Sequence, residues 1–287
     1  MTDNVAKTRM RLRFARLEGA GNMSHLDQIK ALRGIAAASG LDCCPAKHGR
    51  NLVPKMSFGP ALSAGYESRS EYADLYLAQA CREEVARAKL AAVKPEAFSL
   101  LSVKRVPVYF PSIEASVSAV RYLIEAEFKG NFTQADVDAF LARASAPYVK
   151  PAPAPPFWSL PGTAGQNSRH LSASFSPKRA GPAGEAGPGV TIDVRPLVMS
   201  AELDAPAGAL RLTLKTGPGR NIKPVEVLGV MAGRPSPFGS PDMALNPYLV
   251  PKLSVPKPKE PGRELEIKKV VREELYWLDS KGRLEVI

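Results

Sequence analysis

Apolar and polar residues alternate along several stretches of the chain, and a period of two predicts half-buried β-strands. The most informative stretch runs from Asn51 to Leu77. Its pattern predicts two strands joined by a turn rich in Gly and Pro. The turn contains more specified residues than a plain hairpin needs, among them Gly65, Glu67 and Ser68. We therefore expect the rest of the chain to be organised around this hairpin.

The pattern before and after this hairpin predicts a strand, a helix, the two hairpin strands, a second helix and a last strand. The first strand spans 9–16, and the first helix begins at the N-cap Ser24 and ends at Gly40. The second helix spans about 82–92 and the last strand about 99–108. This order is that of the ferredoxin-like, or split βαβ, arrangement.

A similar order begins again after residue 112. The pattern predicts a strand at 118–128, a helix capped by Thr133, strands at 170–177, 190–203 and 210–215, and a short helix at 224–231. Pro-rich stretches cover 147–156 and 234–262, and 272–287 is typical of a closing hairpin. The predicted class is α+β, with two tandem ferredoxin-like units at 1–112 and 113–232. A Pro-rich C-terminal extension follows at 233–287.

Charge adds a class of partner to this picture. The chain has a formal net charge of +11, and basic proteins commonly bind polyanions, of which nucleic acid is the usual one. A generic basic surface is the alternative. No run of about 18 apolar residues predicts a membrane span, and the N-terminus lacks the apolar core of a secretory signal. We expect a cytoplasmic protein that does not bind a membrane.

The three cysteines also favour a cytoplasmic location, and they give no indication of a metal site. Cys43 and Cys44 are adjacent and Cys81 is distant, which is neither a disulfide framework nor the spacing of a zinc or iron–sulfur site. We expect no metal and no cofactor bound by this chain.

Four short motifs together resemble one bacterial family. They are Met23-Ser24-His25-Leu26-Asp27, Pro54-Lys55-Met56-Ser57-Phe58, Gly65-Tyr66-Glu67-Ser68 and Glu71-Tyr72-Ala73-Asp74. They are similar to those of the radical-SAM-linked proteins, which are fused to, or encoded beside, a radical SAM enzyme that often carries a cobalamin-binding region. The resemblance implies such an enzyme as partner, with S-adenosylmethionine and the iron–sulfur cluster in that enzyme.

His25 and Glu67 are the candidate catalytic residues. His25 stands in the first turn of the first predicted helix, where it could donate to a phosphate, move a proton or anchor the preceding loop. Asp27 is expected to cap that helix. Glu67 belongs with Ser68, Glu71 and Asp74 to an acidic cluster in and after the turn. Such carboxylates do acid–base work or bind metals, or else they pair with arginines of a neighbouring strand. We expect Asp74 to form such a pair, and Glu67 and Ser68 to lie at the tip of the turn, free for function.

The candidate substrate-binding residues are mostly basic and aromatic. Arg9, Arg11 and Arg13 alternate along the first strand and are expected to share a sheet face with Tyr72 and Tyr76. Basic and aromatic side chains on an open sheet face are typical of RNA-binding sheets. The alternative is that the second domain packs on this face. Lys55, Ser57 and Ser68 complete the set near the motif hairpin.

A second candidate is the basic glycine-containing loop at 215–224, which contains Arg220 and Lys223. A strand, a Gly loop and a helix start could bind phosphate through backbone N–H groups, although the spacing is not that of a P-loop. A tight strand-to-helix turn is the alternative.

These observations favour an accessory protein that presents RNA to a radical SAM enzyme for modification. A stand-alone RNA-processing or RNA-modifying enzyme that uses His25 and Glu67 is the alternative, and a purely structural scaffold is a third hypothesis.

Overall fold

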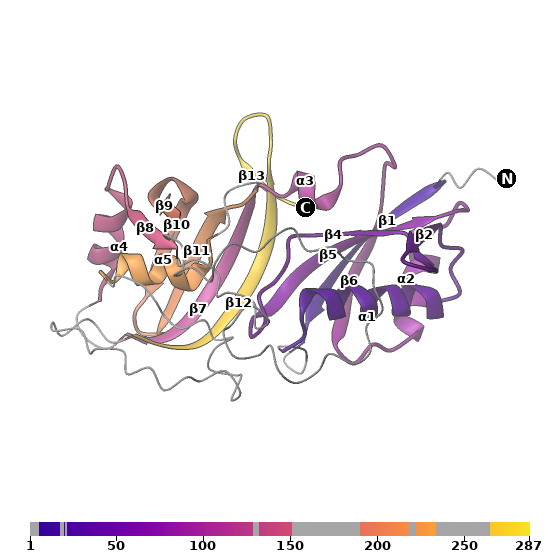
Figure 1. Ribbon diagram of the computed structural model, residues 1–287, viewed down its shortest axis with the longest axis horizontal. Coiled ribbons are helices and arrows are strands. Elements are labelled where there is room, and N and C mark those ends of the chain that lie inside the picture. The colour runs from indigo at the N-terminus through magenta and orange to yellow at the C-terminus, as the bar shows by residue number, and fades with distance from the viewer. Residues whose placement is uncertain are drawn as a thin grey trace, which may run out of the picture.

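The protein has a mixed α+β fold built on one large sheet (Figure 1). The computed structural model describes residues 6–17, 20, 22–128, 132–150, 190–217, 222–233 and 265–287. Within these residues the sheet has nine strands, in the order β10-β11-β7-β12-β5-β1-β6. β4 pairs with β5 and β13 pairs with β12, both off this path. The predicted strand at 170–177, the Pro-rich stretch 234–262 and most of the Pro-rich stretch 147–156 lie outside the described residues.

The first half of the sheet contains the family motifs. Its elements are β1 (Thr8–Arg16), α1 (His25–Ala38), β2 (Pro45–His48), β3 (Asn51–Pro54), β4 (Met56–Phe58), β5 (Glu67–Leu77), α2 (Glu83–Ala92) and β6 (Phe98–Val106). β1 lies between β5 and β6, and β4 lies on the other side of β5, all antiparallel. β2 and β3 form a separate hairpin. The six predicted elements of the first half correspond to β1, α1, β4, β5, α2 and β6, whereas the β2–β3 hairpin was not predicted.

The second half has the same order of main elements with different insertions. It contains α3 (Ile113–Ser116), β7 (Ala119–Phe128), α4 (Gln134–Leu141), β8 (Pro147–Lys150), β9 (Val190–Asp193), β10 (Val198–Asp204), β11 (Ala209–Lys215), α5 (Pro224–Met231), β12 (Leu265–Leu278) and β13 (Leu284–Val286). β7 lies between β11 and β12, and β10 lies at the far edge. The predicted strand at 190–203 is two strands, β9 and β10, separated by a short 3₁₀ turn.

β12 joins the two halves into one continuous sheet. It pairs antiparallel with β7 along most of its length, and it pairs parallel with β5 at Val271–Glu67 and Arg272–Ser68. The closing hairpin expected near the C-terminus is present between β12 and β13. Its first strand is longer than the sequence indicated and lies inside the sheet. In Figure 1 the two halves diverge on one side of this short parallel contact.

Two hydrophobic cores lie under the helices. In the first half, Met10, Leu12 and Phe14 of β1 pack with Leu32 of α1 and Leu90 of α2. The second core gathers side chains of β7, β10, β11, α4 and α5, and it also includes Leu62 and Tyr66. Because Leu62 and Tyr66 come from the connection between β4 and β5, the motif hairpin contributes to both halves.

The connection between β4 and β5 differs from the sequence prediction. Glu67 and Ser68 are the first two residues of β5 rather than the tip of a turn. The tight turn lies earlier, where Tyr66 N–H donates to the Ser63 carbonyl and Gly65 has a φ of 81°. A side chain at position 65 would be strained, so Gly65 serves the backbone here.

Candidate functional site

Two of the four motifs, those that contain His25 and Glu71, meet where β5, β12 and the start of α1 come together. The seam cluster consists of Arg16, His25, Gln28, Glu71 and Arg272. Arg272 reaches from β12 and donates to Glu71 at 3.0 and 3.1 Å. It also donates to the carbonyls of Pro60 and Ala61 at 2.9 and 2.8 Å. One arginine therefore holds together the motif connection, β5 and the C-terminal strand.

Arg16 closes the other side of the seam cluster. It donates to the carbonyls of Ala20 and Met23 in the loop before α1, and weakly to Gln28 at 3.4 Å. Burial lowers the pKa of Arg16, and Arg272 lowers it further, whereas Glu71 raises it. Burial also opposes the charge of Arg272, but Glu71 and Tyr122 outweigh it and raise the pKa of Arg272. Glu71 thus supplies the negative charge between two buried arginines.

His25 is the first residue of α1 and lies within the field of this cluster. Its Nδ1 is buried, with no hydrogen-bond partner among the described residues. Burial lowers the pKa of His25; Glu71 and Glu114 raise it, and Arg272 and Arg16 lower it. The charges that act on His25 include Glu71 and do not include Glu67. Glu67 instead pairs with Lys269 of β12 at 2.8 Å. The two candidate catalytic residues therefore face different partners.

The neighbouring Asp27 caps α1 as expected. Ser24 is the N-cap, and its Oγ accepts from the Asp27 backbone N–H at 3.2 Å and donates to the Asp27 carboxylate at 2.6 Å. The hydrogen bond from Ser24 lowers the pKa of Asp27. This arrangement gives Asp27 a structural role at the helix start.

Asp74 forms the ion pair that its position across from β1 predicted. Arg9 donates to it through Nε at 2.8 Å and through a second nitrogen, and Arg11 donates through Nε at 2.9 Å. Asp74 and Arg9 have no exposed surface. Arg9 also donates to the carbonyls of Phe110 and Pro111. The segment after β6 therefore covers this part of the sheet.

The predicted open face is thus covered in part, which corrects the sequence interpretation. Arg9, Ser68 and Tyr72 are buried. Tyr72 packs with Ile113, Val117, Val120 and Leu275, and its hydroxyl donates to Glu274 at 2.8 Å. Burial raises the pKa of Tyr72 to about 12. The 107–117 segment and β12 bury this face, so these three side chains serve the fold rather than a ligand.

Other predicted residues remain nearer the surface. Arg13 donates to Ser70 at 2.8 Å and pairs with Glu274. Lys55 is exposed, and its Nζ lies 4.9 Å from the ring centre of Tyr76. Ser57 stands opposite Asp74 between β4 and β5, and its Oγ has no partner among the described residues. Sequence reasoning missed Arg16, Gln28, Arg272 and Glu274, because their roles depend on contacts between distant segments.

The glycine-containing loop before α5 contributes less than expected. Arg220 lies outside the described residues. Lys223 is the N-cap of α5, and its backbone N–H donates to Glu226 at 2.9 Å. That amide is occupied by the helix's own first turn, which favours the tight-turn alternative.

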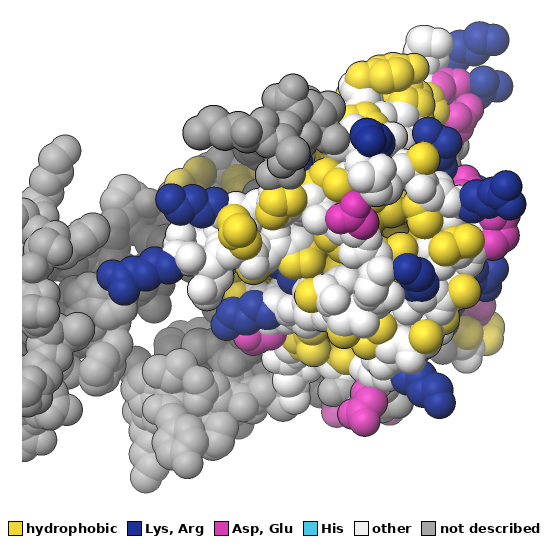
Figure 2. Space-filling model, turned by 90° about the vertical axis from the view of Figure 1, so that its right-hand side faces the viewer, with side chains coloured by type: hydrophobic (Ala, Val, Ile, Leu, Met, Phe, Trp, Pro, Cys, Tyr) yellow, Lys and Arg dark blue, Asp and Glu magenta, His cyan; other side chains and the backbone are white. Residues whose placement is uncertain are grey.

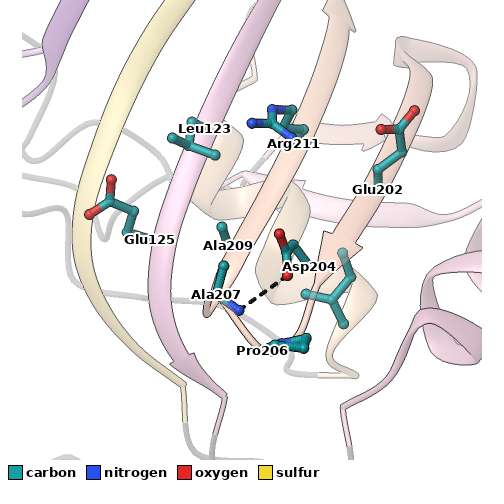
Figure 3. A pocket seen from close by; sticks show the side chains of 9 residues that line it. Leu123, Glu125, Glu202, Asp204, Pro206, Ala207, Ala209 and Arg211 are labelled. Carbon is teal, nitrogen blue, oxygen red and sulfur yellow. Dashed lines mark hydrogen bonds between the residues drawn. The ribbon is translucent and has the colours of Figure 1, made fainter.

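A shallow hollow of about 510 Å³ lies on the second half, away from the motifs (Figure 3). Its walls come from β7, β10, β11 and the β10–β11 turn. Figure 3 shows Glu125, Glu202 and Asp204 around it, with Arg211 as its one basic residue. Asp204 accepts from the Ala207 N–H at 3.1 Å and so holds the turn. Three carboxylates and one arginine make the hollow unsuited to a phosphate.

Figure 2 shows how the basic side chains are distributed over one end of the molecule. At the end of the molecule seen in Figure 2, Lys and Arg side chains mostly stand apart, with Asp and Glu among them.

No group of three or more metal-ligating side chains occurs within the described residues. Among the helices of the described part, none is long and apolar enough to cross a membrane.

Comparison with known proteins adds the family. No curated protein matches the sequence. Residues 9–152 match a bacterial family described as "Uncharacterized protein conserved in bacteria (DUF2344)". The match contains the four motifs, β1 to β8 and most of the seam cluster, and it covers half of the chain. The chain belongs to the DUF2344 family.

Proposed function

We propose that the chain is an accessory protein that binds RNA and works in the cytoplasm beside a radical SAM enzyme. The motifs that resemble the radical-SAM-linked proteins support the partner, and the net charge of +11 supports a polyanionic ligand. In this proposal the enzyme brings S-adenosylmethionine and the iron–sulfur cluster. The chain contributes a binding surface and no reacting group.

One observation carries the accessory role: the carboxylates of the motifs are all engaged within the fold. Glu67 pairs with Lys269, Glu71 with Arg272, and Asp74 with Arg9 and Arg11. Asp27 is held by Ser24 at the start of α1. A general acid or base must reach a substrate proton, and these groups are occupied by structural partners. The motifs then mark a scaffold that fixes how β12 and the first half join.

We further propose that each half is a ferredoxin-like unit. The strand order β6-β1-β5-β4 in the first half and β12-β7-β11-β10 in the second support this, with two helices on one side of each. In both, the strand after the second helix lies beside the first strand.

The RNA proposal is tested by titrating the purified protein into a fluorescent, unstructured oligoribonucleotide at several salt concentrations. Binding should weaken steeply with salt, because each contacted phosphate contributes about −0.7 to the slope of log K against log salt. An affinity that is absent at low salt, or that does not change with salt, contradicts the proposal.

The partner proposal needs a separate experiment. A tagged copy of the chain should form a complex with a radical SAM enzyme from the same genome when both are expressed together. The variant Glu67→Lys places a lysine beside Lys269 at the contact between β5 and β12. This variant should weaken the complex only if repulsion between the two lysines disturbs the β5–β12 contact. A folded wild-type chain that never associates with that enzyme would remove the partner from the proposal.

A further inference from the structure

Two large aromatic side chains lie exposed on the connection between the halves. Tyr109 is 86% exposed and Phe110 is 48% exposed. Their ring centres lie 5.4 Å apart, with the planes at 75°. Exposed aromatic side chains are costly to leave in water, and paired ones commonly mark a binding surface. The turn that carries them, residues 107–110, is called the aromatic turn below.

The backbone of the aromatic turn is held firmly. Phe110 N–H donates to the Pro107 carbonyl at 3.2 Å, which closes the turn. The carbonyls of Phe110 and Pro111 accept from Arg9, whose side chain is buried and paired with Asp74. Directly after the turn, Ile113 is fully buried against Tyr72 and Leu275. The two rings are therefore presented on a fixed support, which reduces the entropy that a ligand must overcome.

Basic side chains lie next to the aromatic turn. Val106, the last residue of β6, stands opposite Arg9, and Lys104 stands opposite Arg11. Lys104 is thus three residues, or roughly 10 Å, along the chain from Pro107, the first residue of the turn. Lys104 and Lys55 are exposed, and neither forms an ion pair with another residue in the described part of the chain. Lys55 lies between β3 and β4, and its Nζ is 4.9 Å from the ring centre of Tyr76 in β5.

We propose that the aromatic turn stacks an unpaired RNA base while Lys104 and Lys55 contact the backbone phosphates. This inference rests on the proposed function and names the site for it. Stacking on aromatic rings accepts any base, and flanking cations follow the strand, which is the usual arrangement for single-stranded nucleic acid. A protein partner fits less well, because lysine is depleted at protein–protein interfaces and both exposed cations named here are lysines.

The main test repeats the titration of the fluorescent oligoribonucleotide with three variants of the protein. Tyr109→Ala combined with Phe110→Ala should weaken binding of the oligoribonucleotide on the order of tenfold and leave the salt slope unchanged. Lys104→Gln should instead flatten the slope by about 0.7. Trp277→Ala removes an exposed aromatic residue of the β12–β13 hairpin and should bind as the wild type does. Thermal unfolding of each variant checks that it is folded, as expected for exposed side chains.

Ultraviolet cross-linking to the same RNA gives an independent readout. The tryptic peptide 106–121 carries the aromatic turn, and 273–281 carries Trp277. Cross-links should concentrate in peptide 106–121. If the wild type binds no RNA, the proposed function fails together with this inference. If the wild type binds RNA while the double variant binds equally well and cross-links elsewhere, only the inference is overturned. A double variant that keeps RNA binding but loses the radical SAM enzyme would make the turn a protein-docking site and would also overturn it.

Discussion

At the scale of single residues, the most unusual feature is a set of buried arginines. Arg9, Arg16 and Arg272 are the largest side chains with almost no exposure. Arginine is rarely buried unless it is paired, because its charge is costly to remove from water. Arg9 and Arg272 are paired with a motif carboxylate, and all three arginines donate to backbone carbonyls. Two of the motif acids, Asp74 and Glu71, therefore serve as counter-charges to buried arginines.

This explanation predicts a large difference between two similar carboxylates of β5. Glu71→Gln leaves Arg272 buried without a counter-charge, which should cost about 3–5 kcal/mol and lower Tm by on the order of 10 °C. Glu67→Gln removes a partly exposed pair and should cost at most about 1 kcal/mol. Differential scanning calorimetry of both variants measures this. Equal Tm values for the two would contradict the role assigned to Glu71.

His25 gives a prediction about pH. Burial lowers its pKa below the ordinary value of 6.5, so the unfolded chain binds a proton more readily than the folded one. The stability that the neutral imidazole provides is present above pH 6.5 and is lost as the pH falls through the lower, folded pKa. Urea unfolding from pH 7.5 to 5 should show this loss in the wild type, with a weaker loss in His25→Asn. Parallel pH profiles would exclude His25 as the titrating group.

At the scale of elements, the 107–117 segment depends on one side chain. Arg9 donates to two of its carbonyls, whereas Arg11 shares Asp74 with Arg9 and donates to no carbonyl of the segment among the described residues. Arg9→Gln should therefore speed amide hydrogen exchange in peptide 106–121, and Arg11→Gln should not. Peptides from β11 provide the internal reference, since global destabilisation would speed exchange there as well. Equal exchange in both variants would show that apolar contacts alone hold the segment.

The local elements could be predicted from the sequence, whereas the contacts between distant segments could not. Ser24, Thr133 and Pro224 mark the starts of α1, α4 and α5, because caps and first-turn prolines act within a few residues. The pairing of Asp74 with β1 also followed, since strand alternation determines which side chains face each other. Arg272 was missed because it lies 201 residues from Glu71. The burial of Tyr72 was not predicted for the same reason, since Leu275, which packs against it, comes from the far end of the chain.

At the scale of the whole molecule, the two halves share more than a linker. β12 pairs with both β7 and β5, and the connection between β4 and β5 sends Leu62 and Tyr66 into the second core. Interlocked halves of this kind should unfold together. In urea, peptides from β1 and from β11 should therefore lose protection against hydrogen exchange at the same midpoint. Two separate midpoints would mean that the halves are independently stable.

The position of Arg272 has a consequence for how the protein is made. A ribosome adds roughly 5–20 residues each second, so the 201 residues between Glu71 and Arg272 take roughly 10–40 s. During that time the first residues of β5 lack β12 as a neighbouring strand, and Glu71 lacks the positive charge of Arg272. Closing a loop of this length also costs on the order of 5 kcal/mol of chain entropy before the contact forms. The first half therefore spends its early lifetime as an unfinished sheet edge, a state in which chaperone binding and aggregation compete with the arrival of the last strand.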